Sequence, residues 1–313
     1  MNPETLRTLL PAFNRFELPK AEATANYLSH YDLNFVATGD AAQQTIGLIA
    51  HNHQTLVGQA FFATNASANA LIVHGYMDHS GLYGKLIRHL LAQNINVFII
   101  DLPGHGLSSG QQASIDNFEQ YCGAVTALHT EALKNCAQGP WFLFGQSMGG
   151  AIAMSLLQKQ QLDIAKTVLL APLVQPRAWR SLKWAHSLLK HVICAMPRSF
   201  SGNSHDRVFT QFIKHHDTLQ TQTMPIAWIN AMRVWRGQFL SQSASNAQVL
   251  LIQGTGDQTI DWRYGNHEIA RLFPNHKTMI INDGMHHLAN ESDAYLQPVL
   301  SAIDHYLFDS TQI

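Results

Sequence analysis

Short apolar segments alternate with amphipathic ones along most of this sequence, and that rhythm limits the fold more than any other feature. Residues 141–144 and 249–252 are wholly apolar and have the length of buried strands. Residues 82–92 instead place five apolar side chains on one helical face, namely Leu82, Leu86, Ile87, Leu90 and Leu91. Because apolar strands followed by helices must be covered on both sides, the pattern predicts a parallel sheet between two layers of helices.

The same pattern predicts where the individual elements lie. Eight strands are expected, at residues 45–50, 55–62, 70–73, 96–100, 141–144, 167–170, 249–252 and 278–281. The first two have period-two character and polar breaks, which is typical of an antiparallel edge. Helices are expected at residues 82–92, 115–133 and 149–158. The predicted fold class is therefore α/β, with a mostly parallel eight-stranded sheet.

Residues 173–245 interrupt this rhythm. No strand is evident there, and helix formers occur together with four of the six tryptophans, which are Trp179, Trp184, Trp228 and Trp235. We interpret this stretch as a helical cap inserted between the sixth and seventh strands. The predicted core domain is formed by residues 1–172 and 246–313, and it starts with a helical or irregular lead-in over residues 1–40.

Composition argues against several classes of protein. Apolar residues make up 46% of the 313 residues and charged residues 13%, so a large core is expected rather than disorder. The net charge of −1 and the lack of a basic stripe argue against a nucleic-acid partner. The start of the chain does not resemble a signal peptide, and no window approaches 18 continuous apolar residues, so no membrane span is expected.

Cysteine and histidine usage gives a further expectation. The three cysteines, Cys122, Cys136 and Cys194, are an odd count without paired spacing, which does not indicate a disulfide framework. We interpret them as reduced thiols of a cytoplasmic protein. The 18 histidines lack the spacing of metal ligands, so no metal is expected.

The strongest chemical signal is the run Gly145-Gln146-Ser147-Met148-Gly149, between an expected strand and an expected helix. A strand, a tight turn and a helix are the context in which a nucleophilic serine is lifted clear of a sheet. The flanking glycines let the helix approach closely. The alternative is a glycine-rich turn with a bystander serine, and the context favours Ser147 as the nucleophile.

A serine hydroxyl needs a base, and the base needs an orienting acid. Behind such an elbow the acid comes next in the chain and the histidine last. Asp257 lies in the loop after the strand at 249–252, and Asp261, four residues on, is the alternative. His286 and His287 both follow the strand at 278–281. Only one of these two rings can meet both Ser147 and the acid.

Acyl transfer also needs donors for the oxyanion of the tetrahedral intermediate. One expected donor is the backbone N–H of Met148, directly after the nucleophile. The second is the N–H of Tyr76, in the loop after the strand at 70–73. His74 in the same loop is expected to brace it by hydrogen bonds rather than to act in catalysis.

With these residues, the sequence resembles the lysophospholipase and monoacylglycerol lipase branch of the α/β-hydrolases, also described as serine aminopeptidase-like. The resemblance covers roughly residues 47–313 and is weakest in the cap. It rests on five blocks in order, which are residues 74–80, 101–108, 145–150, 253–257 and 286–291.

The resemblance implies the α/β-hydrolase fold, a Ser-Asp-His order and ester hydrolysis. It also bears on the base, because the family places a glutamate five residues after its histidine. Glu291 lies five residues after His286 and so favours His286. The family also places a glycine three residues before its histidine, and Gly284 lies three residues before His287, which favours His287. The match onward from His286 is better, so His286 is the predicted base. The block at 101–108 is a structural loop in this family, so His105 is not expected to be catalytic.

The predicted substrate is a monoacyl lipid, either a lysophospholipid or a monoacylglycerol, and no cofactor is needed. Apolar cap residues at near-helical spacing are expected to pack the cap and in part to line an acyl pocket. They are Trp184, Leu188, Leu189, Val192, Ile193 and Met196, then Trp228, Ile229, Met232, Trp235 and Phe239. The alternatives are a peptidase, an acyltransferase or an inactive binding protein. Peripheral contact with a membrane and the oligomeric state stay open.

Overall fold

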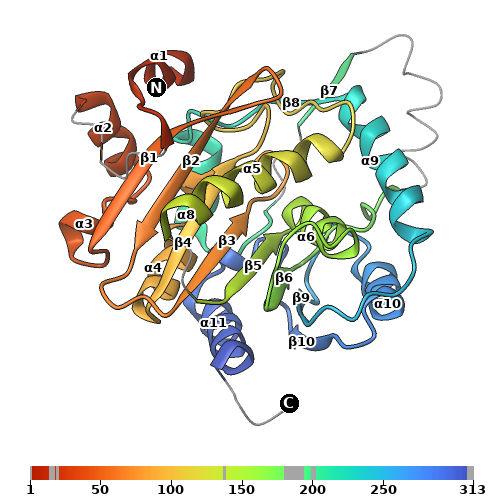
Figure 1. The fold of residues 1–313 in the computed structure, drawn as a ribbon. Helices are drawn as coiled ribbons and strands as arrows, with labels where there is room; N and C mark the ends of the chain where they lie inside the picture. The colour runs from red at the N-terminus through yellow and green to blue at the C-terminus, as the bar shows by residue number, and fades with distance from the viewer. Residues whose placement is uncertain are drawn as a thin grey trace.

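The main sheet has eight strands in the order β1-β2-β4-β3-β5-β6-β9-β10 (Figure 1). The computed structural model describes residues 2–13, 18, 21–136, 139–179, 194–198 and 202–308. The strands are β1 (Gln43–His51), β2 (Gln54–Phe62), β3 (Ala68–Val73), β4 (Ile95–Asp101), β5 (Trp141–Gln146), β6 (Lys166–Leu170), β9 (Val249–Gly254) and β10 (Lys277–Ile281). The predicted eight strands and the α/β class are confirmed.

The strands β1 and β2 form an antiparallel hairpin at one edge of the sheet. Asn52 and His53 make its turn with φ of 45° and 61°, the left-handed values that a two-residue hairpin needs. Strand β2 pairs antiparallel with β4, and every later pairing is parallel. The carboxyl ends of β3, β5, β6, β9 and β10 therefore meet at one edge, where sites of such sheets lie.

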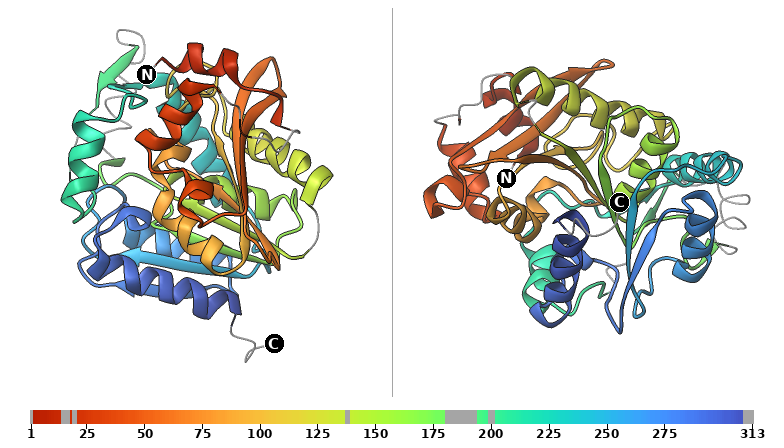
Figure 2. Two further views of the ribbon diagram at one scale, coloured as in Figure 1. Left: turned by 90° about the vertical axis from the view of Figure 1, so that its left-hand side faces the viewer. Right: turned by 60° about the horizontal axis from the view of Figure 1, so that its bottom comes forward.

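Side chains of the strands alternate between two cores, one on each face of the sheet. On β4, Val97 and Ile99 belong to one core while Phe98 and Ile100 belong to the other. The first core includes side chains of the helices α4 (Gly84–Ala92) and α11 (Asp293–Phe308). The second includes side chains of α5 (Glu119–Cys136), α6 (Met148–Gln158) and α10 (Trp262–Leu272). The sheet thus lies between two helical layers (Figure 2), as the apolar strands predict.

The lead-in consists of three short helices, α1 (Pro3–Leu9), α2 (Glu22–His30) and α3 (Phe35–Thr38). Leu6 of α1 and Leu28 of α2 join the first core together with Ile46 of β1. These helices therefore cover the hairpin edge of the sheet, as Figure 1 also shows. A helical or irregular lead-in is confirmed for its described residues.

Two predicted helices start later than expected. The helix expected at 82–92 begins at Gly84, after the 3-10 turn η2 (Ser80–Leu82). The helix expected at 115–133 is α5, which begins at Glu119 and ends at Cys136. Ile115 and Phe118 lie in the loop before this helix and are buried. Their spacing therefore looks like that of a helical face although they are not helical.

Between β6 and β9 the chain leaves the main sheet, and we call residues 171–248 the insertion. Its described elements are β7 (Ala195–Pro197), α8 (Arg207–His215), β8 (Thr223–Pro225) and α9 (Ile226–Leu240). The expectation of no strand here is wrong, because β7 and β8 pair antiparallel. Strands of three residues that each end in proline carry no periodic signal. The predicted cap residues Trp184, Leu188, Leu189, Val192 and Ile193 lie outside the described residues.

Candidate active site

Ser147 occupies a strained turn between β5 and α6. Its φ of 55° and ψ of −114° lie outside the regions that a non-glycine residue normally adopts. Such a conformation costs roughly 1–3 kcal/mol and persists only where its surroundings impose it. Here the Ser147 N–H donates to the Leu170 carbonyl at 2.9 Å, and the Ser147 carbonyl accepts from the Leu173 N–H at 2.9 Å. The turn is therefore held by the strand next to β5.

The two motif glycines are required by close backbone approach. A Cβ atom on Gly149 would overlap the carbonyl oxygen of Val73, at the end of β3. A Cβ atom on Gly145 would lie 2.5 Å from the carbonyl oxygen of Gly149. The helix α6 can thus start against β3 and β5 only because both positions lack side chains. This geometry supports a true elbow rather than a chance motif.

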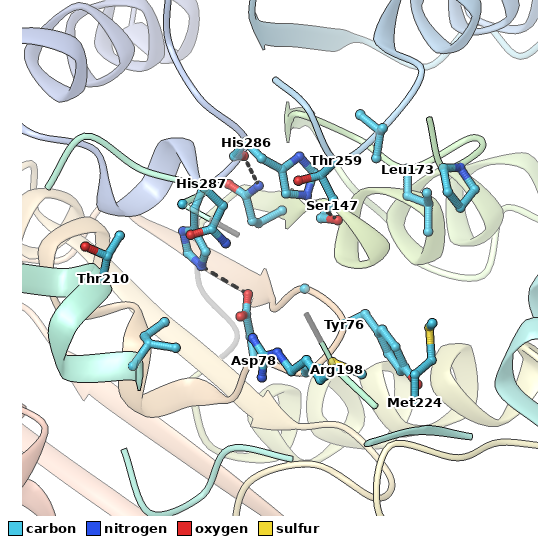
Figure 3. A pocket seen from close by; sticks show the side chains of 18 of the residues that line it. Tyr76, Asp78, Ser147, Leu173, Arg198, Thr210, Met224, Thr259, His286 and His287 are labelled. Carbon is cyan, nitrogen blue, oxygen red and sulfur yellow. Dashed lines mark hydrogen bonds and ion pairs between the residues drawn. The ribbon is translucent and has the colours of Figure 1, made fainter. Parts of the chain in front are cut away.

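His286 lies between Ser147 and Asp257, and Figure 3 shows its ring beside Ser147. Its Nε2 atom is 2.9 Å from Ser147 Oγ, and its Nδ1 atom is 2.7 Å from Asp257 Oδ2. Asp257 follows β9 and His286 follows β10, so the parallel strands bring together residues that are distant in sequence. The contacts match a nucleophile, a base and an orienting carboxylate in hydrogen-bond reach. The structure brings the three predicted residues together.

Asp257 is held as a carboxylate. Its Oδ1 atom accepts from the backbone N–H groups of Thr259 and Ile260 at 2.8 and 3.1 Å, and Oδ2 accepts from Gln253 Nε2 at 3.2 Å. Burial alone would raise the pKa of Asp257, but the attraction of His286 and these hydrogen bonds outweigh it and lower that pKa below its ordinary value. An ionised Asp257 can orient the ring of His286 and stabilise its charged form.

The alternative acid, Asp261, has a different role. It is the N-cap residue of α10, where its Oδ1 atom accepts from the Tyr264 N–H at 3.3 Å. Its other oxygen accepts from Gln175 Nε2 at 2.9 Å. These are the partners of a helix-capping aspartate. Within the described part of the chain, no histidine is a hydrogen-bond partner of the Asp261 carboxylate.

The alternative base, His287, turns away from Ser147. Its Nε2 atom is 3.1 Å from Asp78 Oδ2, in the loop after β3 (Figure 3). Its backbone N–H donates to the carbonyl of Asn203 in the insertion at 2.8 Å. Of the two adjacent histidines, the structure therefore sets His286 against Ser147 and Asp257.

Two side chains that the sequence did not single out for this task hold the histidine loop. Gln146, the residue before the serine, donates from Nε2 to the His286 carbonyl at 2.8 Å. Glu291, known beforehand only as a family marker, accepts from the Met285 N–H at 2.7 Å and is fully buried. Its position five residues after His286 thus has a structural reason, because it closes the loop that carries the ring.

The loop after β3 forms a turn in which the Asp78 N–H donates to the Gly75 carbonyl at 3.3 Å. Met77 in this turn has φ of 64°. Tyr76 lines the same cavity as Ser147. Within the described part of the chain, neither the Tyr76 amide nor the Met148 amide donates to an acceptor. Both predicted oxyanion donors are therefore available for a ligand.

His74 braces this loop, as predicted. Its Nε2 atom accepts from the Leu102 N–H at 2.9 Å, so its Nδ1 atom carries the proton and donates to the Gly75 carbonyl at 2.8 Å. Burial lowers the pKa of His74 to about 3, which keeps the ring neutral at physiological pH. Both ring nitrogens are thus used in structural bonds.

The loop at 101–108 is structural as well. Asp101 is fully buried and accepts from the backbone N–H groups of Ser80 and Leu107, each at 2.7 Å. His105 is buried, its Nδ1 atom lies 2.9 Å from the Pro103 carbonyl, and burial lowers its pKa to about 4. The interpretation of His105 as a non-catalytic residue is consistent with these bonds.

A cavity of about 530 Å³ opens over Ser147 and His286. Its apolar wall includes Leu173, Met224, Trp228, Ile229, Met232 and Ile260, and Ile213 of α8 is a further apolar lining residue. Its polar wall consists of Asp78, Arg198, Asn203, Thr210, Gln211, Lys214 and His287. The ring of Trp228 stacks on that of Tyr76 with centroids 3.7 Å apart, which joins α9 to the loop after β3.

The apolar face of α9 divides into two parts. Trp228, Ile229 and Met232 reach the cavity. Trp235 instead packs on the core domain, stacks on Phe118 at 5.0 Å and donates from Nε1 to Ser155 Oγ at 2.7 Å. The expectation that these residues partly pack the insertion and partly line a pocket is confirmed for α9.

Two features are absent from the described residues. No group of three or more histidine, cysteine, aspartate or glutamate side chains is placed to hold a metal ion there. No helix in that part of the chain combines the length and the apolar character needed to cross a membrane.

Comparison with known proteins gives consistent results. The human monoglyceride lipase is 26% identical over 231 residues, covering 70% of this chain and 75% of that protein. A monoglyceride lipase homolog of monkeypox virus is 26% identical over 258 residues, covering 79% of this chain and 91% of that protein. The structure of a soluble variant of monoglyceride lipase from Saccharomyces cerevisiae, solved with a substrate analog, superposes with a TM-score of 0.75 at 16% identity. The superposition covers 85% of this chain and 95% of that chain.

The resemblance to the monoacylglycerol lipase branch is thereby confirmed, and the structural neighbour supports the fold. A family model described as serine aminopeptidase, S33, matches residues 64–293, which is more than half of the chain. This chain belongs to the serine aminopeptidase S33 family and has the α/β-hydrolase fold.

Proposed function

We propose that this protein is a serine hydrolase that cleaves the carboxylic ester of a monoacyl lipid, either a lysophospholipid or a monoacylglycerol. The observation that carries the proposal is the hydrogen-bond chain from Ser147 Oγ through His286 to Asp257, at 2.9 and 2.7 Å, beneath a largely apolar cavity. The relatives named as monoglyceride lipases support the same class of substrate.

In the first half of the reaction His286 Nε2 accepts the proton of Ser147 Oγ, and Oγ attacks the ester carbonyl carbon. The carbonyl oxygen becomes an oxyanion, which accepts hydrogen bonds from the Tyr76 and Met148 amides. When the tetrahedral intermediate collapses, the ester C–O bond breaks and His286 donates its proton to the leaving alcohol. The acyl group stays on Ser147.

In the second half water replaces the alcohol. His286 takes a proton from that water, whose oxygen attacks the acyl carbon, and then returns the proton to Ser147 Oγ as the fatty acid leaves. Asp257 keeps the Nδ1 proton of His286 in place through both halves and stabilises the imidazolium. These steps use only side chains and amides of this chain.

The division of the cavity suggests how a monoacyl lipid binds. We propose that the acyl chain lies along the apolar wall from Leu173 to Met232, and that the head group faces the polar wall with Asp78, Arg198 and Asn203. In this arrangement residues 173–245 act as a cap that supplies most of the acyl site. We also propose a cytoplasmic location, which is supported by the free thiols of Cys122 and Cys194.

The family name raises aminopeptidase activity as a second candidate. An aminopeptidase would need a carboxylate for the ammonium group of its substrate. Among the described residues that line the cavity, Asp78 is the one carboxylate, and it already bonds His287 and Tyr83. The site therefore favours the ester over the aminoacyl amide.

The test is hydrolysis of a panel by the purified protein and its Ser147→Ala variant. The panel contains a monoacylglycerol, a lysophosphatidylcholine, a short p-nitrophenyl ester and an aminoacyl amide. We expect turnover of the esters, no turnover by the variant, and labelling by a fluorophosphonate probe only in the unchanged protein. Ester turnover by Ser147→Ala would refute the proposal, and a preference for the amide would replace it by the second candidate.

A further inference from the structure

A second histidine–carboxylate pair lies on the cavity wall, and none of the catalytic steps uses it. His287 and Asp78 are both buried, with Nε2 of the ring 3.1 Å from Oδ2 of the carboxylate (Figure 3). Two buried ionisable groups cost free energy unless their partners are fixed. The pair therefore needs a structural or functional reason.

The direction of the hydrogen bonds follows from Asn290. Its Nδ2 atom lies 3.5 Å from His287 Nδ1 and also donates to the carbonyl of Leu82. An amide nitrogen can only donate, so Nδ1 of His287 is the acceptor and Nε2 carries the proton. His287 thus donates to Asp78, and Asn290 sets this tautomer.

Tyr83 extends the chain of bonds to the oxyanion loop. Its hydroxyl donates to Asp78 Oδ2 at 3.1 Å and accepts from the Gly75 N–H at 3.0 Å. Burial alone would raise the pKa of Asp78, but the electrostatic attraction of His287, the hydrogen bond from its ring and the charge of Arg198 lower that pKa below its ordinary value. An ionised Asp78 accepts from His287 and Tyr83 together, as this geometry requires.

The turn from Gly75 to Asp78 needs such support. Met77 sits at φ of 64° in the third position of the turn, where glycine is usual. The Asp78 carboxylate folds back over the start of the turn, since a Cβ atom on Gly75 would lie 2.7 Å from Asp78 Oδ2. A turn with this strain relaxes unless the surrounding bonds determine it.

We infer that His287, Asp78 and Tyr83 are positioning residues that hold the Gly75–Asp78 turn so that the Tyr76 amide faces the oxyanion. The inference rests on the proposed function, because it gives these residues a task only if an oxyanion forms at Ser147. His287 acts here through Asp78 and Tyr83 and does not exchange a proton with the substrate.

The expected signature is a loss in kcat with little change in KM, because the oxyanion exists only in the transition state. Removing an oxyanion donor altogether costs about 10²–10³-fold in kcat. Loosening one donor should cost less, so we expect about a tenfold loss for Tyr83→Phe and for His287→Ala. The variant His287→Gln, whose amide can still donate to Asp78, should recover most of the activity.

The experiment measures kcat and KM on a short p-nitrophenyl ester and the inhibition constant of a trifluoromethyl ketone with the same acyl chain. The ketone adds to Ser147 and places an oxyanion in the same position as the intermediate does. We expect its inhibition constant to rise by the factor by which kcat falls, with KM within about twofold. Tyr306→Phe is the matched control, since this buried tyrosine lies on α11 beside Lys166, at the start of β6 and away from the oxyanion loop.

The end-point stoichiometry of fluorophosphonate labelling counts correctly folded sites, so kcat is expressed per labelled serine. The inference would be overturned if Tyr83→Phe and His287→Ala had the same kcat and the same inhibition constant as the unchanged protein. A fall in kcat without a parallel change in the inhibition constant would also overturn it. Neither outcome would contradict the proposed function. That proposal has its own test, and it fails if Ser147→Ala still hydrolyses esters.

Discussion

At the scale of single residues, two neighbouring histidines have acquired different partners. His286 lies between Ser147 and Asp257, while His287 bonds Asp78. The sequence predicts a serine, an aspartate and a histidine in this order, but its two markers for the base, Gly284 and Glu291, point to different histidines. Side-chain direction in a loop depends on backbone torsions that no periodic pattern encodes. The catalytic roles therefore need separate tests.

The first test compares His286→Ala with His287→Ala. Loss of the base should lower kcat on a monoacylglycerol by about 10⁴-fold or more, as in other serine hydrolases that lose their histidine. Loss of His287 should lower it by about tenfold only. Steady-state kinetics on both variants measures the difference, and the reverse order of the two effects would exchange the assignments.

The second test compares Asp257→Asn with Asp261→Asn. An asparagine beside His286 favours the wrong tautomer and cannot stabilise the imidazolium, so we expect a loss in kcat of about 10⁴-fold. Asp261 caps α10, and asparagine caps a helix about as well, so the second variant should keep its activity. Equal losses in the two variants would show that Asp257 is not the acid.

At the scale of elements, the sequence predicts those parts of the fold that bury apolar strands. The eight strands of the main sheet are found because the first two alternate with period two and the others contain short apolar runs. The pair β7 and β8 is missed, because its three-residue strands lie 25 or more residues apart and only Pro225 among their residues is buried. The start of α5 is misplaced because Ile115 and Phe118 are buried from a loop.

The close packing of α6 against β3 makes a prediction about glycine. Gly149→Ala would drive a methyl group into the carbonyl of Val73, so we expect a loss of more than about 3 kcal/mol in the free energy of unfolding. The control is Gly237→Ala on α9, where nothing lies within 4 Å of the new methyl group. That variant should gain about 0.5–1 kcal/mol from helix propensity. Urea unfolding measures both, and a neutral Gly149→Ala would contradict the packing argument.

A buried ion pair connects the insertion to the core domain. Asp217 Oδ2 lies 3.0 Å from His79 Nε2, and both side chains are at most 1% exposed. Tyr31 also donates to Asp217 at 2.8 Å. Removing one partner leaves the other charge buried, so Asp217→Ala should lower the free energy of unfolding by about 3 kcal/mol. Lys159→Ala breaks the exposed pair with Glu119 and should cost less than about 1 kcal/mol, and similar losses would contradict this role for Asp217.

At the scale of the whole molecule, the site exists only because the sheet brings four strand ends together. The order of Ser147, Asp257 and His286 is legible in the sequence because each follows an apolar strand. The cavity was not predictable in shape, because its walls come from the insertion, where α8 and α9 approach the core over long sequence distances. The bond from Gln146 to the His286 carbonyl was missed because it joins residues that are distant in sequence. The bonds of Tyr83 are local, but they depend on side-chain directions in a loop, which no periodic pattern encodes.

The pair of Asp217 and His79 also predicts how the stability of the molecule depends on pH. Burial opposes both charges, but their mutual attraction outweighs it, so the pKa of Asp217 falls to about 2 and that of His79 rises above 6.5. A carboxyl with a lowered pKa contributes stability above its ordinary value of 3.8 and loses that contribution as the pH falls through about 2. A histidine with a raised pKa contributes below 6.5 and loses its contribution as the pH rises through the raised value.

The difference in unfolding free energy between the unchanged protein and Asp217→Asn should therefore be largest between pH 3.8 and 6.5. It should shrink on the acid side as Asp217 takes up a proton, and on the alkaline side as His79 releases one. Urea unfolding at a series of pH values measures this difference. A difference that does not change with pH would mean that the two groups are not charged partners, and that their charges do not help to hold the insertion on the core.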